Sequence, residues 1–328
     1  MNTVSAAIDL GGTTVKCAAV TADGRVLHAN RIPTPKTGQV DVIESIAAMV
    51  TELRSELSNA GGQDVDALGL GSPGMIGADG YLYGEAVNIP GWREFNLADA
   101  VSRRIGLPVT ALNDANAAAL AELSVSGDSR TLALVTVGTG IGVGLAIDGK
   151  PHAGRAGAGG ELGHLVIRPG GRPCPCGNAG CTEAYASARA VRELAREQAG
   201  AWSDTASRFA SQVKEDAPGT GEADIFASLY DAVRQGDPFA LQMHQDFCGV
   251  LAQVAAILAS TIAPDRVLFG GGVMGSADLI LPEVITQFGR LVMPHVHEHV
   301  RIDAARLGAD AGLIGAALAA RQSVGDAQ

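Results

Sequence analysis

Residues 5–20 read SAAIDLGGTTVKCAAV, and this stretch decides the fold. Two apolar runs, Ser5–Leu10 and Val15–Val20, flank a pair of glycines, which is the pattern of two strands joined by a tight turn. A third run, Arg25–Ile32, follows an Asp-Gly turn. We therefore predict that three antiparallel strands open the chain.

The same pattern returns near the middle of the chain. Residues 131–147 read TLALVTVGTGIGVGLAI, so that two more strands, Thr131–Val137 and Gly142–Ile147, flank Gly138-Thr139-Gly140. The repeat predicts an internal duplication. Two similar lobes would leave a cleft between them, where ligands usually bind.

Apolar residues elsewhere alternate between helical and strand spacing. Helices are expected at Val42–Leu57, Leu97–Ile105, Ala115–Leu123, Glu183–Gln198, Asp224–Arg234, Pro238–Ile262 and Gly312–Arg321, and further strands at Ala67–Gly71, Pro108–Leu112 and Arg266–Phe269. This alternation predicts an α/β fold with helices packed on a mixed sheet. We place a small lobe at residues 1–113 with 311–328 and a large lobe at 114–310. Residues 202–221, rich in Ser, Asp and Gly, read as a loop-containing connector or insertion.

Composition limits the classes of function. The 328 residues are 47% hydrophobic and 18% charged, values typical of an ordered globular protein. A formal net charge of -11 argues against a nucleic-acid surface, although glycine-rich turns can still bind small phosphates through backbone N–H groups. No stretch approaches the roughly 18 apolar residues of a membrane span, and the first residues do not resemble a signal peptide. We expect a cytoplasmic protein that binds neither nucleic acid nor membranes.

Three of the five cysteines, Cys174, Cys176 and Cys181, lie close together, with His164 ten residues before the first. Three thiolates and one imidazole are a ligand set for tetrahedral zinc, although buried free thiols would also fit the pattern. Four protein ligands leave no position for a catalytic water, so a zinc ion here would be structural.

The first glycine turn carries groups that suit a nucleotide. Glycines let the backbone approach phosphate, the hydroxyls of Thr13 and Thr14 can donate to phosphate oxygens, and Asp9 can hold a hydrated Mg²⁺. A plain hairpin turn would explain this segment alone, but residues 137–142 repeat the chemistry. A third glycine cluster, Gly270–Gly275, follows a strand and could pack against a nucleoside. Neither a Walker loop nor the loops of a protein kinase are found.

Asn113-Asp114-Ala115-Asn116 lies where a strand ends and an alanine-rich helix begins. Helix capping explains one such residue, at a contribution of about 1 kcal/mol, but not three. Phosphoryl transfer to an alcohol needs a carboxylate that accepts the hydroxyl proton, and a strand end facing a cleft is a suitable place for it.

Together these residues resemble the ROK group of sugar kinases and related repressors. The matching motifs occur in the expected order and cover nearly the whole chain: Asp9–Lys16, Asn113–Ala118, Val137–Gly144, Gly159–His164, Cys174–Glu183 and Gly270–Gly275. The pattern is most similar to the bacterial ATP-dependent glucokinase branch, which often shares the segment Glu85–Asn88. The resemblance implies a two-lobed actin-like (ribonuclease H-like) ATPase fold and a homo-oligomer, either a dimer or a tetramer.

The resemblance also implies roles for individual residues, with Asp114 as the general base. Sugar-binding residues would be Gly74, Asn88, Asn113, Asp114, Glu161, His164 and Glu183. ATP and Mg²⁺ would be bound by Asp9, Gly11, Gly12, Thr13, Thr14, Lys16, Gly138, Thr139, Gly140, Gly271 and Gly272. The structural Zn²⁺ would be held by His164, Cys174, Cys176 and Cys181.

Simpler interpretations exist for several of these residues. Glu161 could be a solvated charge, Glu183 could stabilise the first turn of its helix, and His164 could be a hydrogen-bonded core histidine. Trp92, in the segment Asn88–Trp92, could form an aromatic wall for a sugar or fill a core.

The sequence therefore predicts ATP-dependent phosphorylation of a hexose, with D-glucose as the favoured acceptor and glucose 6-phosphate as the product. Mannose, fructose or N-acetylmannosamine are alternative acceptors, and polyphosphate is an alternative donor. A sugar-responsive ROK regulator is the rival outside the enzymes. Such regulators carry an N-terminal DNA-binding extension, whereas here the first strand begins within a few residues of Met1 and the chain is acidic.

Overall fold

The computed structural model describes residues 4–61, 64–86, 88–203, 207–215 and 224–326. The chain forms two compact units. The first comprises Met1–Leu134, Gly144–Gly160 and Arg306–Gln328, and the second comprises Val135–Val143 and Glu161–Ala305. These boundaries differ from those of the lobes expected from the sequence, 1–113 with 311–328 and 114–310, which stay a prediction.

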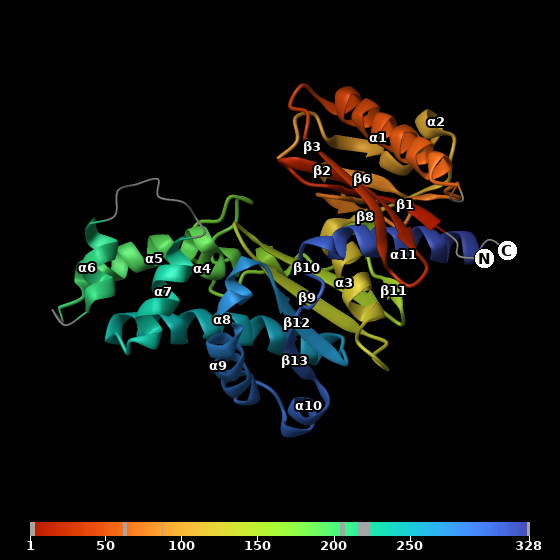
Figure 1. Ribbon diagram of the computed structural model, residues 1–328. Helices are drawn as coiled ribbons and strands as arrows, with labels where there is room; N and C mark the ends of the chain where they lie inside the picture. The colour runs from red at the N-terminus through yellow and green to blue at the C-terminus, as the bar shows by residue number, and fades with distance from the viewer. Residues whose placement is uncertain (1–3, 62–63, 87, 204–206, 216–223, 327–328) are drawn as a thin grey trace. The chain divides into compact units, whose positions relative to one another are not determined.

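The first five-stranded sheet has the order β3-β2-β1-β4-β8. Figure 1 labels its strands β1, β2, β3 and β8. Its strands are β1 (Val4–Leu10), β2 (Thr14–Thr21), β3 (Val26–Pro33), β4 (Leu68–Ser72) and β8 (Val109–Asn113). β1, β2 and β3 pair antiparallel, as predicted, whereas β4 runs parallel to both β1 and β8.

The second five-stranded sheet repeats this plan with the order β11-β10-β9-β12-β13. Its strands are β9 (Leu132–Val137), β10 (Ile141–Ile147), β11 (Lys150–Pro151), β12 (Arg266–Gly270) and β13 (Arg301–Ala304). In both sheets the third, second, first, fourth and fifth strands in chain order lie side by side, and the last pair is parallel. The duplication expected from the two hairpins is confirmed by this topology.

Helices cover both faces of the first sheet. They are α1 (Gln39–Asn59), α2 (Leu97–Ile105), α3 (Asp114–Ser124) and α11 (Ala311–Asp326). Successive side chains of β1 point to opposite faces, so Ile8 and Leu10 join the core that includes residues of α1, while Ala7 joins the core under α3 and α11. α11 lies very close to its neighbours, because a Cβ at Gly315 would collide with the carbonyl of Ala117 in α3.

A small antiparallel sheet, which the sequence analysis missed, completes the first unit. It contains β5 (Met75–Ile76), β6 (Tyr81–Glu85) and β7 (Arg93–Asn96). Trp92, next to β7, is fully buried, packs edge-on against Phe95 and donates from Nε1 to the Ser72 hydroxyl at 3.0 Å. Trp92 therefore fills a core.

The second unit is largely helical. Its helices are α4 (Glu183–Ala186), α5 (Ala188–Ala201), α6 (Arg208–Glu215), α7 (Asp224–Arg234), α8 (Pro238–Thr261), α9 (Ala277–Gly289) and α10 (Pro294–His299). Phe239, Met243 and Phe247 of α8 are buried. No described helix is both long and apolar enough to cross a membrane.

One expectation about this unit needs correction. The single helix predicted at Glu183–Gln198 is two helices, because Ser187 adopts an extended conformation and its hydroxyl caps α5 by accepting from the Ala190 N–H. The expected connector at 202–221 contains α6, and residues 204–206 and 216–221 lie outside the described residues.

Candidate active site and metal cluster

The first glycine turn joins β1 to β2 and is held by charged and hydroxyl side chains. Asp9 and Lys16 face each other across the two strands, and Lys16 Nζ lies 3.0 Å from Asp9 Oδ2. Thr34 donates to the Gly11 carbonyl at 2.7 Å, and Lys36 donates to the Gly12 carbonyl. Contacts within the first unit therefore fix the Asp9–Lys16 pair and the backbone of this predicted phosphate loop.

Asn88 lies beside the same turn. A Cβ at Gly12 would come within 2.8 Å of Asn88 Cβ, so only glycine allows this approach. Lys36 also donates to the Asn88 carbonyl at 3.1 Å, which ties the predicted sugar-side residue to the predicted phosphate loop.

Asn113 and Asp114 mark the junction of β8 and α3. Asn113 Oδ1 accepts from the backbone N–H groups of Ala115 and Asn116, at 2.9 and 3.2 Å, and Asn113 Nδ2 donates to the Gly74 carbonyl at 3.0 Å. Capping is thus one function of Asn113, and its amide also brings Gly74 to the start of α3. The first turn of a helix favours a negative charge, which suits the Asp114 carboxylate.

The third polar residue of this motif has a separate partner. Asn116 is 2% exposed, and its Oδ1 accepts from the Leu145 N–H at 2.8 Å. It therefore fixes α3 to β10 and is not free to bind a ligand.

The second glycine turn joins β9 to β10 and is held by residues of α4 and α5. Glu183 Oε2 accepts from the Ile141 N–H at 3.0 Å, and the Ala188 N–H donates to the Gly138 carbonyl at 2.9 Å. A Cβ at Gly140 would collide with the Glu183 carboxylate. Glu183 is therefore more than a charge at a helix start, because it braces this loop.

A cavity of about 490 Å³ lies within the second unit beside this turn. Its lining residues come from the second glycine turn, the third glycine cluster, and helices α5 and α7: Val137, Gly138, Thr139, Ala188, Phe226, Ala227, Asp231, Arg234, Gly272, Val273, Gly275 and Ser276. Volumes of about 300–1,000 Å³ are usual for small-molecule sites. The structure thus brings together, around one cavity, two glycine clusters more than 130 residues apart in the sequence.

Gly271 makes this approach possible. Its φ of 94° lies in the left-handed region, and a Cβ there would collide with the carbonyl of Val137 at the end of β9. The turn after β12, which continues as the 3₁₀ helix η3 (Gly272–Ser276), can therefore lie against the second glycine turn. A larger cavity of about 680 Å³ beside α6, α7 and the start of α8 contains none of the predicted residues.

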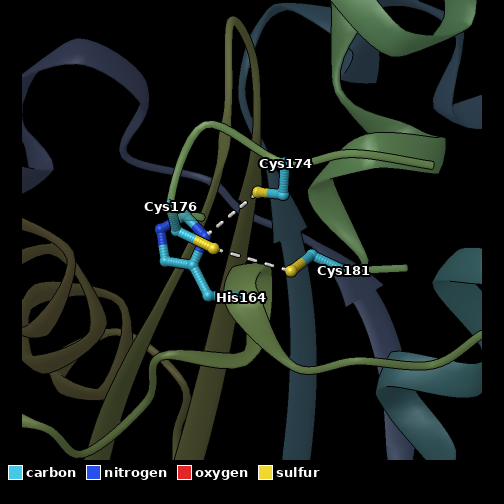
Figure 2. A group of neighbouring side chains, drawn as sticks. All are labelled: His164, Cys174, Cys176 and Cys181. Carbon is cyan, nitrogen blue, oxygen red and sulfur yellow. Dashed lines mark hydrogen bonds between the residues drawn. The ribbon is translucent and has the colours of Figure 1, made fainter. Parts of the chain in front are cut away.

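His164, Cys174, Cys176 and Cys181 form one cluster, with all four ligand atoms within 4.8 Å of one another (Figure 2). His164 Nδ1 lies 3.7 Å from Cys174 Sγ, and Cys176 Sγ lies 3.7 Å from Cys181 Sγ. Ligands about 2.3 Å from zinc at tetrahedral angles put neighbouring sulfurs about 3.8 Å apart. The spacing therefore fits a tetrahedral metal ion.

The surroundings of the three thiols shift their pKa values in different directions. Burial raises the pKa of the Cys174 thiol and raises that of Cys181 to about 12, whereas a hydrogen bond from the Asn178 backbone lowers the pKa of Cys176. Buried thiols of this kind become thiolates when a cation replaces the proton.

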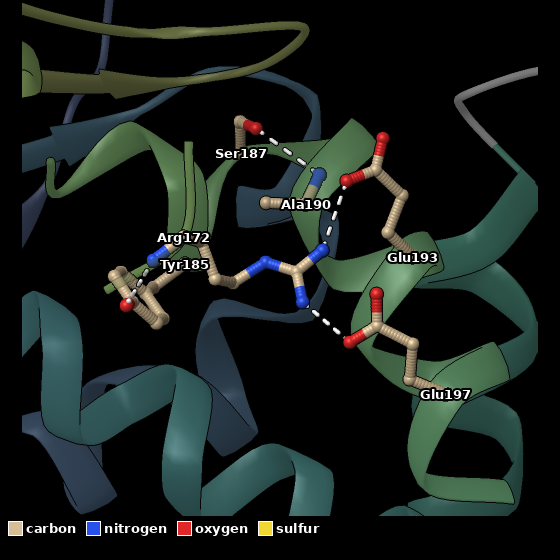
Figure 3. A network of polar contacts seen from close by, with 6 residues as sticks. All are labelled: Arg172, Tyr185, Ser187, Ala190, Glu193 and Glu197. Atoms are coloured by element: carbon tan, nitrogen blue, oxygen red, sulfur yellow. Dashed lines mark hydrogen bonds and ion pairs between the residues drawn. The ribbon is translucent and has the colours of Figure 1, made fainter. Parts of the chain in front are cut away.

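The loop that carries the cysteines is fastened to the helices that follow it (Figure 3). Arg172 pairs with Glu193 at 3.1 Å and with Glu197, both on α5, and its backbone N–H donates to the Tyr185 hydroxyl at 2.9 Å. The guanidinium of Arg168 lies 4.4 Å from the centre of the Tyr185 ring. The metal cluster, α4 and the start of α5 therefore form one connected support.

Glu161 and His164 lie at η2 (Leu162–His164), just before the metal loop. Although Glu161 is an exposed residue, surrounding protein atoms desolvate its carboxyl group and raise its pKa; His164 opposes this shift and Glu183 adds to it. Electrostatic interactions of Glu161 with His164 and Glu183 therefore link these three predicted sugar-binding residues within the second unit. The remaining predicted sugar-binding residues, Gly74, Asn88, Asn113 and Asp114, belong to the first unit.

Sequence reasoning missed two groups of residues. Asp231 and Arg234 line the 490 Å³ cavity, and Arg234 pairs with Asp278 at 3.1 Å. The helix that carries Asp231 and Arg234 was predicted. Polar residues three positions apart are common on the exposed face of any helix, so the sequence did not mark these two as functional. The other is Glu122, a buried carboxylate in α3. The helical pattern of the sequence predicts an ordinary surface charge at this position.

Comparison with known proteins identifies the family of this chain. The model of the ROK family matches residues 5–323. The chain belongs to the ROK family. A ROK relative, the glucokinase of Halalkalibacterium halodurans, is 36% identical over 94% of this chain and 92% of its own length. An N-acetylmannosamine kinase of Salmonella heidelberg is 32% identical over 96% of this chain and 97% of its own length.

A solved ROK structure shows the same fold. The ROK family glucokinase from Streptomyces griseus, in complex with glucose and AMPPNP, superimposes with a TM-score of 0.75 at 34% identity, covering 97% of this chain and 99% of the other. The actin-like ATPase fold implied by the resemblance is thereby confirmed for this ROK protein.

Proposed function

We propose that this ROK protein transfers the γ-phosphoryl group of ATP to the 6-hydroxyl of a hexose, with D-glucose as the preferred acceptor. The observation that carries the proposal is the 490 Å³ cavity, which is lined by Gly138 and Thr139 of one predicted nucleotide loop and by Gly272 of the other. Its size and glycine-rich wall suit a nucleotide, which favours ATP over polyphosphate as the donor. The glucokinase relatives support the same assignment.

Asp114 would act as the general base. Its carboxylate accepts the proton of the sugar hydroxyl while that oxygen forms its bond to the γ-phosphorus and ADP leaves with the electrons of the broken P–O bond. Asn113, fixed by its bonds to α3 and to Gly74, would hold the sugar beside this carboxylate.

The first glycine turn would hold phosphate oxygens through Gly11, Gly12, Thr13, Thr14 and Lys16. Asp9 offers one carboxylate, which suits Mg²⁺ because that ion keeps most of its water ligands in proteins. When bound, Mg²⁺ supplies charge neutralisation of the ATP phosphates.

His164, Cys174, Cys176 and Cys181 would hold a structural Zn²⁺. Their donor set and spacing fit zinc, and four protein ligands leave no open position for chemistry. His164 Nδ1 faces the cluster, so its Nε2 is left to contact a sugar hydroxyl together with Glu161 and Glu183. Gly74 and Asn88 would complete the sugar contacts.

N-acetylmannosamine is the second candidate acceptor, because a relative that is 32% identical carries the name N-acetylmannosamine kinase. The two sugars differ in the size and hydrogen bonding of the substituent at carbon 2, so a site built for one rejects the other. We further propose that the enzyme acts in the cytoplasm as a homodimer or homotetramer.

A coupled assay of ADP release, run with glucose, mannose, fructose and N-acetylmannosamine, tests the assignment. We expect the highest kcat/KM with glucose. A higher kcat/KM with N-acetylmannosamine would show that this sugar is the preferred acceptor. The proposed phosphoryl transfer would stand. Absence of sugar-dependent ADP release with every hexose would reject the kinase assignment and favour the sugar-responsive regulator.

A further inference from the structure

Glu122 is a buried carboxylate that binds two backbone N–H groups. It lies in α3, is 1% exposed, and its Oε1 accepts from the backbone N–H groups of Arg306 and Leu307, both at 2.8 Å. Among the described residues its Oε2 is buried without a hydrogen-bond partner. Burying a carboxylate is costly, so a side chain that only filled space here would be better apolar.

The backbone that Glu122 holds leads directly to the first glycine turn. Arg306 and Leu307 precede the 3₁₀ helix η4 (Gly308–Asp310), and the carbonyl of Ala309 accepts from Lys16 Nζ at 2.9 Å. The same Nζ lies 3.0 Å from Asp9 Oδ2. Hydrogen bonds and the backbone from Leu307 to Ala309 therefore connect the buried carboxylate of α3 to the charged pair of the first glycine turn.

Both ends of this connection are held firmly. α3 is fixed by the bond between Asn116 and Leu145 and by its close packing against Gly315. At the other end, a Cβ at Gly312 would lie 3.0 Å from Asp9 Cγ, so the start of α11 already touches the Asp9 carboxylate. A displacement of the turn between them would therefore move the Lys16 contact.

We propose that Glu122 is a positioning residue for ATP. By holding the turn at Arg306 and Leu307, it places the Ala309 carbonyl so that the Lys16 ammonium stays fixed beside Asp9. The inference rests on the proposed function, because it assumes that Lys16 and Asp9 serve the nucleotide. Sugar binding does not depend on this connection, since Asn113 reaches Gly74 by a separate hydrogen bond.

Three substitutions of Glu122 distinguish the contribution of its hydrogen-bond acceptor from those of its charge and its shape. Glu122→Gln keeps an acceptor oxygen for the two N–H groups, Glu122→Asp withdraws the acceptor by one methylene, and Glu122→Met keeps the shape without the acceptor. The KM for ATP should stay within about twofold for Gln, rise severalfold for Asp and rise about tenfold for Met, because small misplacements of binding groups have effects of this size. The KM for glucose should stay unchanged in all three.

A double-mutant cycle with Lys16→Met distinguishes positioning from general loss of structure. If Glu122 acts through Lys16, the double variant Glu122→Met/Lys16→Met has an ATP KM no higher than the worse single variant. Lys36→Met is the matched control, because Lys36 contacts the same glycine turn without touching the Glu122 connection. In the double variant Glu122→Met/Lys36→Met, the fold-increases in the KM for ATP of the two single variants should multiply. Multiplied effects with Lys16→Met as well would overturn the proposal, and so would a glucose KM that rises as much as the ATP KM.

If Glu122→Met does not fold, Glu122→Asp takes its place in both cycles with the same criteria. If the wild type shows no sugar-dependent ADP release, the proposed function fails independently, and the same cycles are measured as MgATP dissociation constants by calorimetry. Multiplied effects on those constants would then overturn the role of Glu122 itself.

Discussion

The two glycine turns of this ROK protein share a backbone plan and differ in what supports them. The first is held by side chains of nearby strands and loops, including Lys16, Thr34 and Lys36. The second is held by Glu183 and by the N-terminus of α5, which follow the metal cluster in the chain. A repeated sequence therefore predicts a repeated backbone, but each copy acquires its own partners.

This difference makes the second turn dependent on the metal loop. Cys181 lies only two residues before Glu183, and Arg172 ties the loop to α5. The first turn belongs to the other compact unit and has no such link among the described residues. Substitutions should therefore separate into effects on chemistry, on the second turn and on the first.

The largest effect should come from the proposed base, Asp114. Asp114→Asn keeps the size and polarity of the side chain but removes the proton acceptor. We expect kcat to fall by about 100-fold or more, with the KM for ATP nearly unchanged. Steady-state kinetics at saturating sugar measures this, and near-normal turnover would refute the role of Asp114.

The next effect should come from the brace of the second turn. Glu183→Ala leaves the Ile141 N–H without its acceptor, and loss of a hydrogen bond to a charged group costs about 1.5–3 kcal/mol, so the KM for ATP should rise about 10- to 100-fold. Glu183→Gln retains an acceptor and should show a smaller rise. Equal effects of Ala and Gln would show that the charge matters and the brace does not.

Loss of the metal should act on the second turn in the same way, but less strongly. Cys176→Ser should release the metal and raise the KM for ATP by about tenfold, because the Arg172 contacts still hold the loop. Cys248→Ala, at a buried cysteine outside the cluster, is the control and should keep about one zinc per chain. Metal analysis gives the stoichiometry. A wild type with full activity and no bound metal would contradict the zinc assignment.

The smallest of these effects should come from Lys36, which contacts the first turn. Lys36 is exposed, so Lys36→Met should raise the KM for ATP only about two- to threefold. Titration with salt checks the cause, because screening should shrink the difference from the wild type. A larger effect than that of Glu183→Ala would reverse the comparison between the turns.

Much of this fold follows from the sequence because hydrophobic periodicity is local. The hairpins around Gly11 and Gly138 and the junction at Asn113 were predicted from neighbouring residues, and the structure contains them. The break at Ser187 was missed because its hydroxyl caps α5 within an otherwise continuous helical pattern.

The support of the site was less predictable because its partners are distant in the chain. Nothing near Glu122 in the sequence indicates that it binds the backbone at Arg306, and nothing near Glu183 indicates the Ile141 N–H. The cysteine cluster was the exception, since its ligands lie within eighteen consecutive residues, 164–181. The roles of the individual sugar- and nucleotide-binding residues stay predictions.

Phosphorus NMR of one reaction mixture tests the central claim most directly. With ATP, Mg²⁺ and glucose, we expect the γ-phosphate signal to be replaced by one sugar phosphomonoester signal at the position of glucose 6-phosphate, in equal amount to the ADP formed. Inorganic phosphate without a sugar ester, or an unchanged ATP spectrum with every hexose, would contradict the account.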